Sequence, residues 1–204
     1  TWNGLLSTCD EVDCSFPTGA CCLIDESCED EVSEIACMLH GGMWGGNDST
    51  CFTFKCASPI GEDDCEEAML VEAGLHYVDT TQATTDGPSH LECETGGDGG
   101  QIGNDVWLRY EAQSSGQLTL TTCEELGGWG DFDTDLAVYD GVDCDSLVLL
   151  GCNDDDSDHD CGTKAGGWHS TVVVPVTEGN GYLLRIGGWQ EGNTGTAWVL
   201  LNVD

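Results

Sequence analysis

The sequence predicts an all-β fold: an antiparallel jelly-roll-type β-sandwich, preceded by a small disulfide-rich N-terminal module that contains one short helix. Three observations support this prediction. Short apolar runs recur along residues 57–204, each bounded by Gly, Asn, Asp or Ser. Long stretches of helical periodicity are missing from the same region. Fourteen cysteines are distributed unevenly, with eight of them up to Cys56.

Cysteine density divides the chain into three parts, with the main boundary expected within residues 57–61. In the module, Ser33–His40 predicts a short helix that is capped by Ser33 and ended by a pair of glycines. We expect loop in the rest of the module. The three parts are an N-terminal extension, the disulfide-rich module and the sandwich domain: residues 1–8, 9–56 and 57–204.

The sandwich domain contains eight strand-length runs and a short helical turn near residues 64–69. Gly-rich turns between short strands are typical of sandwiches and jelly rolls, and the long repeats of a solenoid are absent from the sequence. The predicted strands cover residues 75–78, 106–110, 117–121, 136–139, 147–150, 171–174, 182–186 and 197–201.

Charge and cysteine usage restrict the class of protein. With 39 acidic and 4 basic residues, the net charge of −35 excludes electrostatic attraction to nucleic acid or to an anionic membrane surface. No apolar run is long enough to span a membrane. The cysteine spacings do not form zinc motifs, so disulfides in an oxidising compartment are the simplest interpretation. The start at Thr1, without a signal-like segment, fits a processed chain, and we expect an extracellular protein, secreted or on a cell surface.

The six later cysteines are expected to pair with one another in sequence order. The break in cysteine density and the turn-like spacing of these cysteines favour this scheme. The eight earlier cysteines should pair among themselves, with a connectivity that the sequence leaves open. The predicted later pairs are Cys65–Cys93, Cys123–Cys144 and Cys152–Cys161.

Two acidic segments are candidates for metal binding. Residues 153–160 hold five carboxylates between two cysteines, and three aspartates alternate along residues 131–135, so their side chains should emerge on one face. Mutual repulsion favours a hard divalent cation with oxygen ligands, Ca²⁺ first. An EF-hand is excluded because Leu136 occupies the position that requires Gly. The alternatives are a solvated acidic loop and aspartates that cap turns. The candidate ligands are Asp131, Asp133, Asp135, Asp154, Asp155, Asp156 and Asp158.

Two sets of motifs resemble known families. In the second domain, the order and spacing of four motifs resemble the bacterial pre-peptidase C-terminal domain, and residues 81–88 resemble segments that precede those motifs. In the module, a GACC start, further cysteines and a Gly-Gly-x-Trp motif resemble a small cysteine-rich repeat of secreted bacterial proteins. The first resemblance implies a secreted, non-catalytic β-sandwich that is often appended to hydrolases or surface proteins and sometimes binds calcium. Its four motifs are Asn104–Trp107, Phe132–Gly141, Cys152–Asp155 and Tyr182–Gly188.

We expect a structural protein without enzymatic activity, stabilised by disulfides and calcium, that assembles with copies of itself into an extracellular filament or surface layer. Neither a G-x-S-x-G elbow nor an H-E-x-x-H helix occurs in the sequence. In the N-terminal extension, Trp2, Leu5 and Leu6 could add a strand to an adjacent subunit.

The alternative is a calcium-dependent adhesive or carbohydrate-binding module of a larger secreted protein. Trp129, Trp168 and Trp189 each follow a Gly-Gly pair and could present flat rings to glycans. Such rings can equally close over the edge of a sandwich core.

Overall fold

The computed structural model describes residues 17–23, 27–39, 42–47, 49–51, 59–93, 99–162 and 164–204. The chain divides into two compact units between Ser58 and Pro59, inside the segment where the sequence places the boundary. The predicted mainly β fold is confirmed for these residues. Three residues of the expected donor segment, Trp2, Leu5 and Leu6, lie outside the described residues.

The first unit contains a three-stranded sheet in the order β2-β1-β3 and the predicted short helix. Ser33 caps this helix, because its Oγ accepts a hydrogen bond from the Ala36 backbone N at 3.3 Å. The elements are β1 (Thr18–Cys22), β2 (Cys28–Ser33), α1 (Glu34–Leu39) and β3 (Met43–Trp44).

The expectation of loop outside that helix was wrong. Strand β2 reads CEDEVS and shows no apolar alternation, so its sequence carries no strand signal. Its order comes from pairing with β1 and from disulfides, since Cys21 bonds to Cys37 of α1 and Cys28 bonds to Cys51. Cys22 is also disulfide-bonded.

The second unit contains all eight predicted strands, two further short strands and several 3₁₀ turns. The strands are β4 (Met69–Val71), β5 (Gly74–Asp79), β6 (Gly103–Glu111), β7 (Gly116–Thr121), β8 (Trp129–Gly130), β9 (Thr134–Asp140), β10 (Val148–Asn153), β11 (Thr171–Val176), β12 (Gly181–Gly188) and β13 (Thr196–Val203). The turns are η1 (Cys65–Glu67), as predicted, η2 (Leu91–Cys93), η3 (Glu124–Leu126), η4 (Cys144–Ser146) and η5 (Lys164–Gly167).

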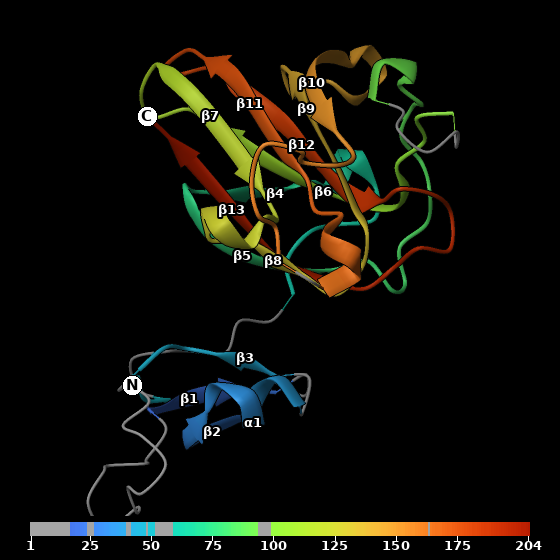
Figure 1. The fold of residues 1–204 in the computed structure, drawn as a ribbon. Coiled ribbons are helices and arrows are strands. Elements are labelled where there is room, and N and C mark those ends of the chain that lie inside the picture. Colours follow the sequence, from blue (N-terminus) through green and yellow to red (C-terminus); the bar gives the residue numbers. More distant parts are fainter. Residues whose placement is uncertain are drawn as a thin grey trace, which may run out of the picture. The chain divides into compact units, whose positions relative to one another are not determined.

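Eight of these strands form a jelly roll, as predicted. One sheet, here called the β9 sheet, has the order β10-β9-β12-β6-β4, and the other, the β7 sheet, has the order β11-β7-β13-β5 with β8 beside β13 (Figure 1). Four antiparallel pairs are nested in sequence: β9 with β10, β7 with β11, β6 with β12 and β5 with β13. This is one long hairpin rolled into two sheets.

The prediction of a purely antiparallel fold needs one correction. Strand β4 pairs in parallel with β6 at the edge of the β9 sheet. It is only three residues long and follows directly after η1, so it adds to the edge without belonging to the nested hairpin.

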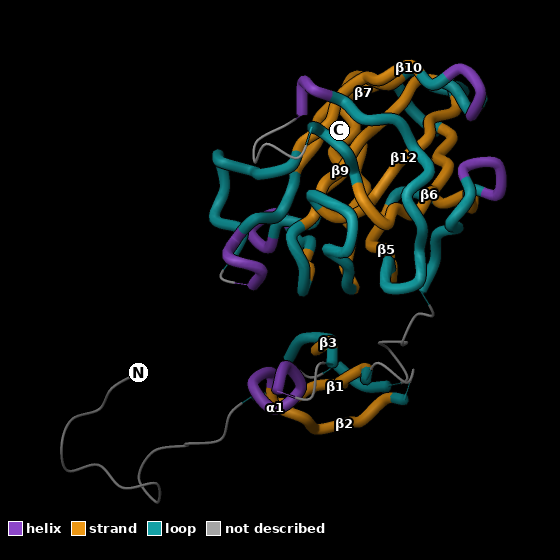
Figure 2. The backbone as a smooth tube through the Cα atoms, turned by 90° about the vertical axis from the view of Figure 1, so that its right-hand side faces the viewer, coloured by secondary structure: helices purple, strands orange, loops and turns teal. Residues whose placement is uncertain are grey.

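The two faces of the β9 sheet are both buried, whereas the β7 sheet is covered mainly on its inner face. The main core lies between the sheets and includes Leu108, Leu120, Val138 and Leu184. A second apolar cluster, on the outer face of the β9 sheet, contains Trp107, Tyr139 and Leu183, each at most 1 % exposed. In the turned view, loops and short helices lie around the strands (Figure 2).

A buried ion pair lies on that outer face. Arg185 Nε donates to Asp105 Oδ2 at 2.9 Å, and both side chains are fully buried. The same guanidinium donates to the carbonyl of Pro88 at 2.7 Å, which ties the loop before β6 to the sheet. A Cβ on Gly87 would collide with the guanidinium and push it away from its partners. Burial raises the pKa of Asp105 to about 6, although Arg185 partly offsets this effect.

All three predicted disulfide pairings in the second unit were wrong, although the six cysteines do pair among themselves. The bonds are Cys65–Cys144, Cys93–Cys152 and Cys123–Cys161, with sequence separations of 79, 59 and 38 residues. The prediction paired neighbours in sequence, but the rolled hairpin brings loops together that are distant in sequence. The acidic loop is therefore joined at each end to a different segment of the domain, and no disulfide closes the loop on itself.

Candidate metal centre

Strand pairing brings the two acidic segments together. Strands β9 and β10 are antiparallel, and their last described pair joins Leu136 to Asn153. The residues just before β9 and just after β10 therefore lie at the same end of the β9 sheet.

Three of the predicted ligands converge at this end. Asp133, Asp154 and Asp155 each place a carboxylate oxygen within 4.8 Å of the others. Asp154 is only 4 % exposed, and the Oδ1 atom of Asp133 is buried without a hydrogen-bond partner among the described residues. Burial, together with the charges of Asp154 and Asp155, raises the pKa of Asp133 to about 7. A bound cation would compensate the mutual repulsion of these three carboxylates.

Residues 168–170, just before β11, hold both acidic segments, 131–135 and 153–160, in place. Ser170 Oγ donates to the carbonyl of Asp154 at 2.6 Å and also lies against the carbonyl of Thr134. The carbonyl of His169 accepts from the Asp156 backbone N at 2.8 Å, and the carbonyl of Trp168 accepts from Thr134 N at 3.2 Å. His169 and Ser170 are fully buried, so they act here as part of the scaffold.

Two of the other predicted ligands in the first segment have different surroundings. Asp131 accepts hydrogen bonds from the backbone N of Thr196 at 2.7 Å and from its Oγ1 at 3.2 Å, so it caps the start of β13. This is the turn-capping role that the sequence left open. Asp135 is buried within β9, opposite Gly187 of β12, and is not one of the three converging carboxylates.

Asp156 organises its own loop. It accepts from the backbone N of Asp158 at 2.9 Å, and its Oδ2 pairs with His159 Nδ1 at 2.8 Å. Burial acts to raise the pKa of Asp156, but hydrogen bonds from Thr171, the Asp158 backbone and His159 outweigh it and lower the pKa. The same hydrogen bond raises the pKa of His159. Asp158 is exposed and is not one of the converging carboxylates.

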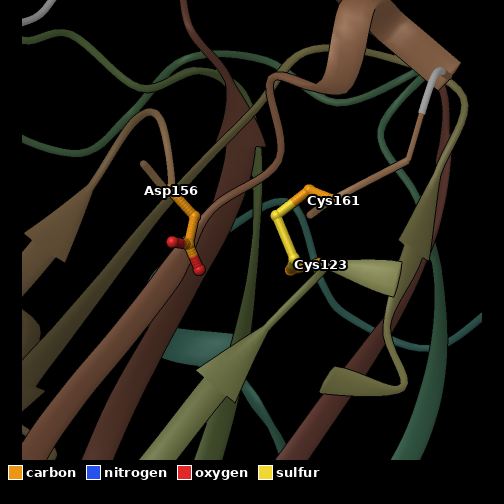
Figure 3. Close-up of side chains that lie close together, drawn as sticks. All are labelled: Cys123, Asp156 and Cys161. Carbon is orange, nitrogen blue, oxygen red and sulfur yellow. A yellow bond between two sulfur atoms is a disulfide. The ribbon is translucent and has the colours of Figure 1, made fainter. Parts of the chain in front are cut away.

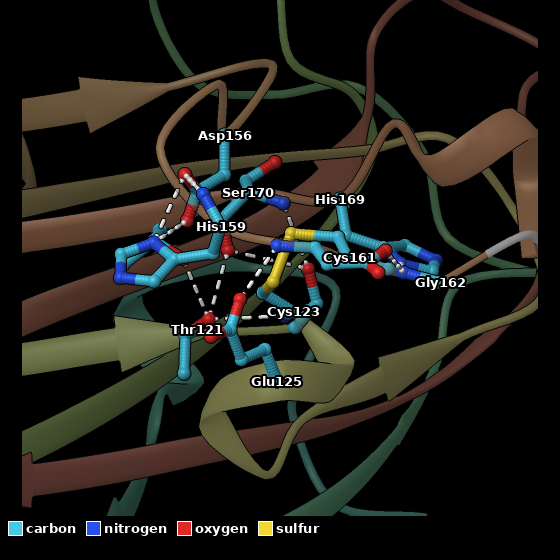
Figure 4. Close-up of a disulfide and its surroundings, with 12 residues drawn as sticks. Thr121, Cys123, Glu125, Asp156, His159, Cys161, Gly162, His169 and Ser170 are labelled. Atoms are coloured by element: carbon cyan, nitrogen blue, oxygen red, sulfur yellow. Dashed lines mark hydrogen bonds and ion pairs between the residues drawn. A yellow bond between two sulfur atoms is a disulfide. The ribbon is translucent and has the colours of Figure 1, made fainter.

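A second group of potential ligand atoms does not form a metal site. Asp156 lies near the sulfur atoms of Cys123 and Cys161, but these sulfurs are bonded to each other (Figure 3). A metal needs the free thiolate, so this group offers a single carboxylate. Figure 4 shows that this disulfide and the hydrogen bonds of Asp156 lie in one connected region with Thr121 and Ser170.

The tryptophans that suggested glycan contacts differ in exposure. Trp129 is half-buried and lies opposite Trp198, which in turn contacts Tyr77 with ring centroids 5.2 Å apart. The rings of Trp198 and Tyr77 pack against each other on neighbouring strands of the β7 sheet. Trp189 is half-buried, whereas Trp168 is 55 % exposed.

The fold and this site define a class of protein: a disulfide-tied jelly-roll sandwich with an acidic cluster at one end. Comparison with protein-family models, with curated proteins and with solved structures gives no match. None of the described helices is long and apolar enough to cross a membrane.

Proposed function

We propose that the chain is an extracellular structural protein without enzymatic activity, whose jelly-roll unit binds Ca²⁺ at Asp133, Asp154 and Asp155 and which assembles with copies of itself into a filament or surface layer. The observation that carries the calcium part is the convergence of these three carboxylates, with the pKa of Asp133 raised to about 7. Calcium prefers oxygen ligands and takes six to eight of them, so backbone carbonyls or water would complete the shell. The five described disulfides support an oxidising compartment.

Thermal unfolding of the oxidised protein in chelator and in calcium tests the site. Extracellular calcium modules have dissociation constants of about 0.1–1 mM, and a hundredfold excess stabilises by about 2.7 kcal/mol per site. We expect Asp133→Asn to remove most of this stabilisation. Asp158→Asn is the matched control, because it makes the same carboxyl-to-amide change at an exposed position of the second acidic segment.

Two results would contradict the calcium site. One is a melting temperature that does not change between chelator and calcium. The other is an equal loss of calcium stabilisation in Asp133→Asn and Asp158→Asn, which would mean that calcium only screens the overall charge.

Exposed apolar side chains on two edge strands support self-assembly. Strands β10 and β11 each form one edge of their sheet, and they contact each other. Val148 and Leu150 on β10 are 58 % and 37 % exposed, and Val173 on β11 is 56 % exposed. Edge strands with apolar side chains are points of association between chains. Calcium would reduce the repulsion between copies that each carry a charge of −35.

Light scattering and negative-stain microscopy in chelator and in calcium test assembly. We expect Val148→Lys to reduce the assembled fraction, because it places a charge on the β10 edge. Leu75→Lys is the matched control, since Leu75 is 43 % exposed on β5, at the opposite edge of the β7 sheet from β11. If Val148→Lys assembled as well as the unchanged protein, the β10 edge would not be the contact between copies. A protein that stays monomeric under all conditions would rule out assembly.

One observation favours a second candidate, calcium-dependent glycan binding. Trp168 is exposed, and its backbone carbonyl bonds to Thr134, next to Asp133. Binding to a glycan array that needs both calcium and Trp168 would favour this function over assembly.

A further inference from the structure

A cavity lies at the opposite end of the β9–β10 hairpin from the acidic cluster. Its volume is about 240 Å³, and it opens on the outer face of the β9 sheet. Leu183 of β12, only 1 % exposed, contributes to its lining, and Arg109 lies beside it as the paired residue of β6. None of the three converging aspartates lines it.

A disulfide fixes the walls of this cavity. The turns η1 and η4 stand on either side, and Cys65 of η1 is bonded to Cys144 of η4 with a Cα–Cα distance of 6.0 Å. The carboxylate of Asp143 accepts from the backbone N of Asp145 at 3.1 Å, which holds the start of η4. The cavity is therefore formed before any ligand binds.

Charges of both signs line the cavity. Glu66, Asp143 and Asp145 supply carboxylates, and Arg109 supplies a guanidinium. Arg109 is exposed, and within the described residues its guanidinium makes no hydrogen bond or ion pair. The other arginine of the chain, Arg185, is fully buried against Asp105. Because no described carboxylate pairs with Arg109, its guanidinium can bind an anionic group that enters the cavity.

We propose that this cavity binds a small zwitterion, an α-amino acid with an apolar side chain. Guanidinium groups bind carboxylates through two parallel hydrogen bonds, which Arg109 can offer to the α-carboxylate. An ammonium group has three donors and no acceptor, and the carboxylates of Glu66, Asp143 and Asp145 can accept them. The apolar side chain would lie against Ala68, Val142 and the disulfide. Pockets for drug-sized ligands measure about 300–1,000 Å³, so this smaller cavity suits a smaller molecule.

Titration calorimetry with three related probes tests the proposal in chelator, so that the result does not depend on the calcium site. L-leucine carries both charges, 4-methylpentanoate lacks the ammonium group, and 3-methylbutylamine lacks the carboxylate. We expect saturable binding of leucine at one site per chain, and binding at least about tenfold weaker for each of the other two probes. Such a ratio corresponds to about 1.4 kcal/mol.

Two variants and one control assign the binding to the cavity. Arg109→Gln should weaken leucine binding at least tenfold and leave the weak binding of the amine unchanged. Asp145→Asn should weaken both leucine and the amine. Glu111→Gln is the matched control, because Glu111 is exposed on the same strand as Arg109 and does not line the cavity. Urea unfolding midpoints show whether each variant remains folded.

Three results would overturn the proposal. The first is the absence of saturable leucine binding up to millimolar concentration. The second is amine binding as tight as that of leucine, which would make the cavity a plain cation site. The third is leucine binding that Arg109→Gln leaves unchanged.

Discussion

The outer faces of the two sheets differ although both sheets share one core. Strand β11 of the β7 sheet reads TVVVPV, and its residues alternate between buried and partly or fully exposed. Strand β9 of the β9 sheet is buried along its whole length except for Asp140. The difference arises because loops, short turns and two disulfides cover the outer face of the β9 sheet.

This comparison shows where the domain uses polar interactions. On the open face of the β7 sheet, water can satisfy polar side chains. On the covered face, Arg185 and Asp105 must satisfy each other, because burying an unpaired charge is costly. Substitutions on the covered face should therefore have large effects and those on the open face small ones.

The largest effect is expected for Arg185→Met. This change leaves the carboxylate of Asp105 buried without its cation and should lower the free energy of unfolding by about 3–5 kcal/mol. Urea denaturation with the disulfides intact measures it. Adding Asp105→Leu should restore part of the loss, because the unpaired charge is then gone. A loss below about 1 kcal/mol would mean that the outer face is open to water.

A somewhat smaller effect is expected from removing the Cys93–Cys152 disulfide by paired substitution with serine. Loss of a cross-link of this kind typically costs about 2–4 kcal/mol. Amide hydrogen exchange should then increase in the loop before η2, where Asp86 and His90 hydrogen-bond to Trp107 and Tyr139. As a control, removing Cys28–Cys51 from the first unit should leave the unfolding of the sandwich unchanged. If this change also destabilised the sandwich, the two units would unfold together.

Calcium stabilisation should depend on pH in a predictable direction. Because the pKa of Asp133 is raised to about 7, the ion-free protein gains stability from its protonated carboxyl at low pH and loses this contribution as the pH rises through 7. Calcium requires the deprotonated carboxylate, so its stabilising effect should be larger at pH 8 than at pH 6. Melting curves at both pH values, with and without calcium, measure this. An effect that is larger at pH 6 would contradict the assignment of Asp133.

The smallest effect is expected on the open face. Val173→Thr should change the free energy of unfolding by no more than about 0.5 kcal/mol, because Val173 is 56 % exposed. Val174→Thr is the matched comparison, since Val174 is 2 % exposed and the same change would bury a hydroxyl there, at a cost of about 1–3 kcal/mol. Equal effects at the two positions would indicate that another chain covers the β7 sheet in solution.

The strands were predictable because apolar runs between turn residues are a local signal. The jelly roll itself followed from their number and spacing. The short strands β1, β2, β3, β4 and β8 were missed, since pairing with neighbours and not their own composition determines them. The disulfide partners were also missed, because they depend on which loops the rolled hairpin brings together.

The candidate site was predictable only in part. Asp133, Asp154 and Asp155 were among the seven expected ligands and do converge, because two acidic segments flank paired strands. Side-chain hydrogen bonds give Asp131 and Asp156 structural roles, which depend on partners far along the chain such as Thr196 and Thr171. The support from residues 168–170 comes mainly through backbone carbonyls, which any sequence carries.

The Cys65–Cys144 disulfide also determines how the domain would respond to a pulling force. Strands β5 and β13, the outermost nested pair, lie near the two ends of the domain sequence and would be separated first. The disulfide would then limit the extension, because the segment between Cys65 and Cys144, a separation of 79 residues, cannot be stretched while the bond is intact. At about 3.4 Å per residue, roughly 270 Å of length stays locked until the bond is reduced. Under tension the domain would thus lengthen to a fixed limit, with strands β4 to β9 inside the closed loop and β10 to β13 outside it.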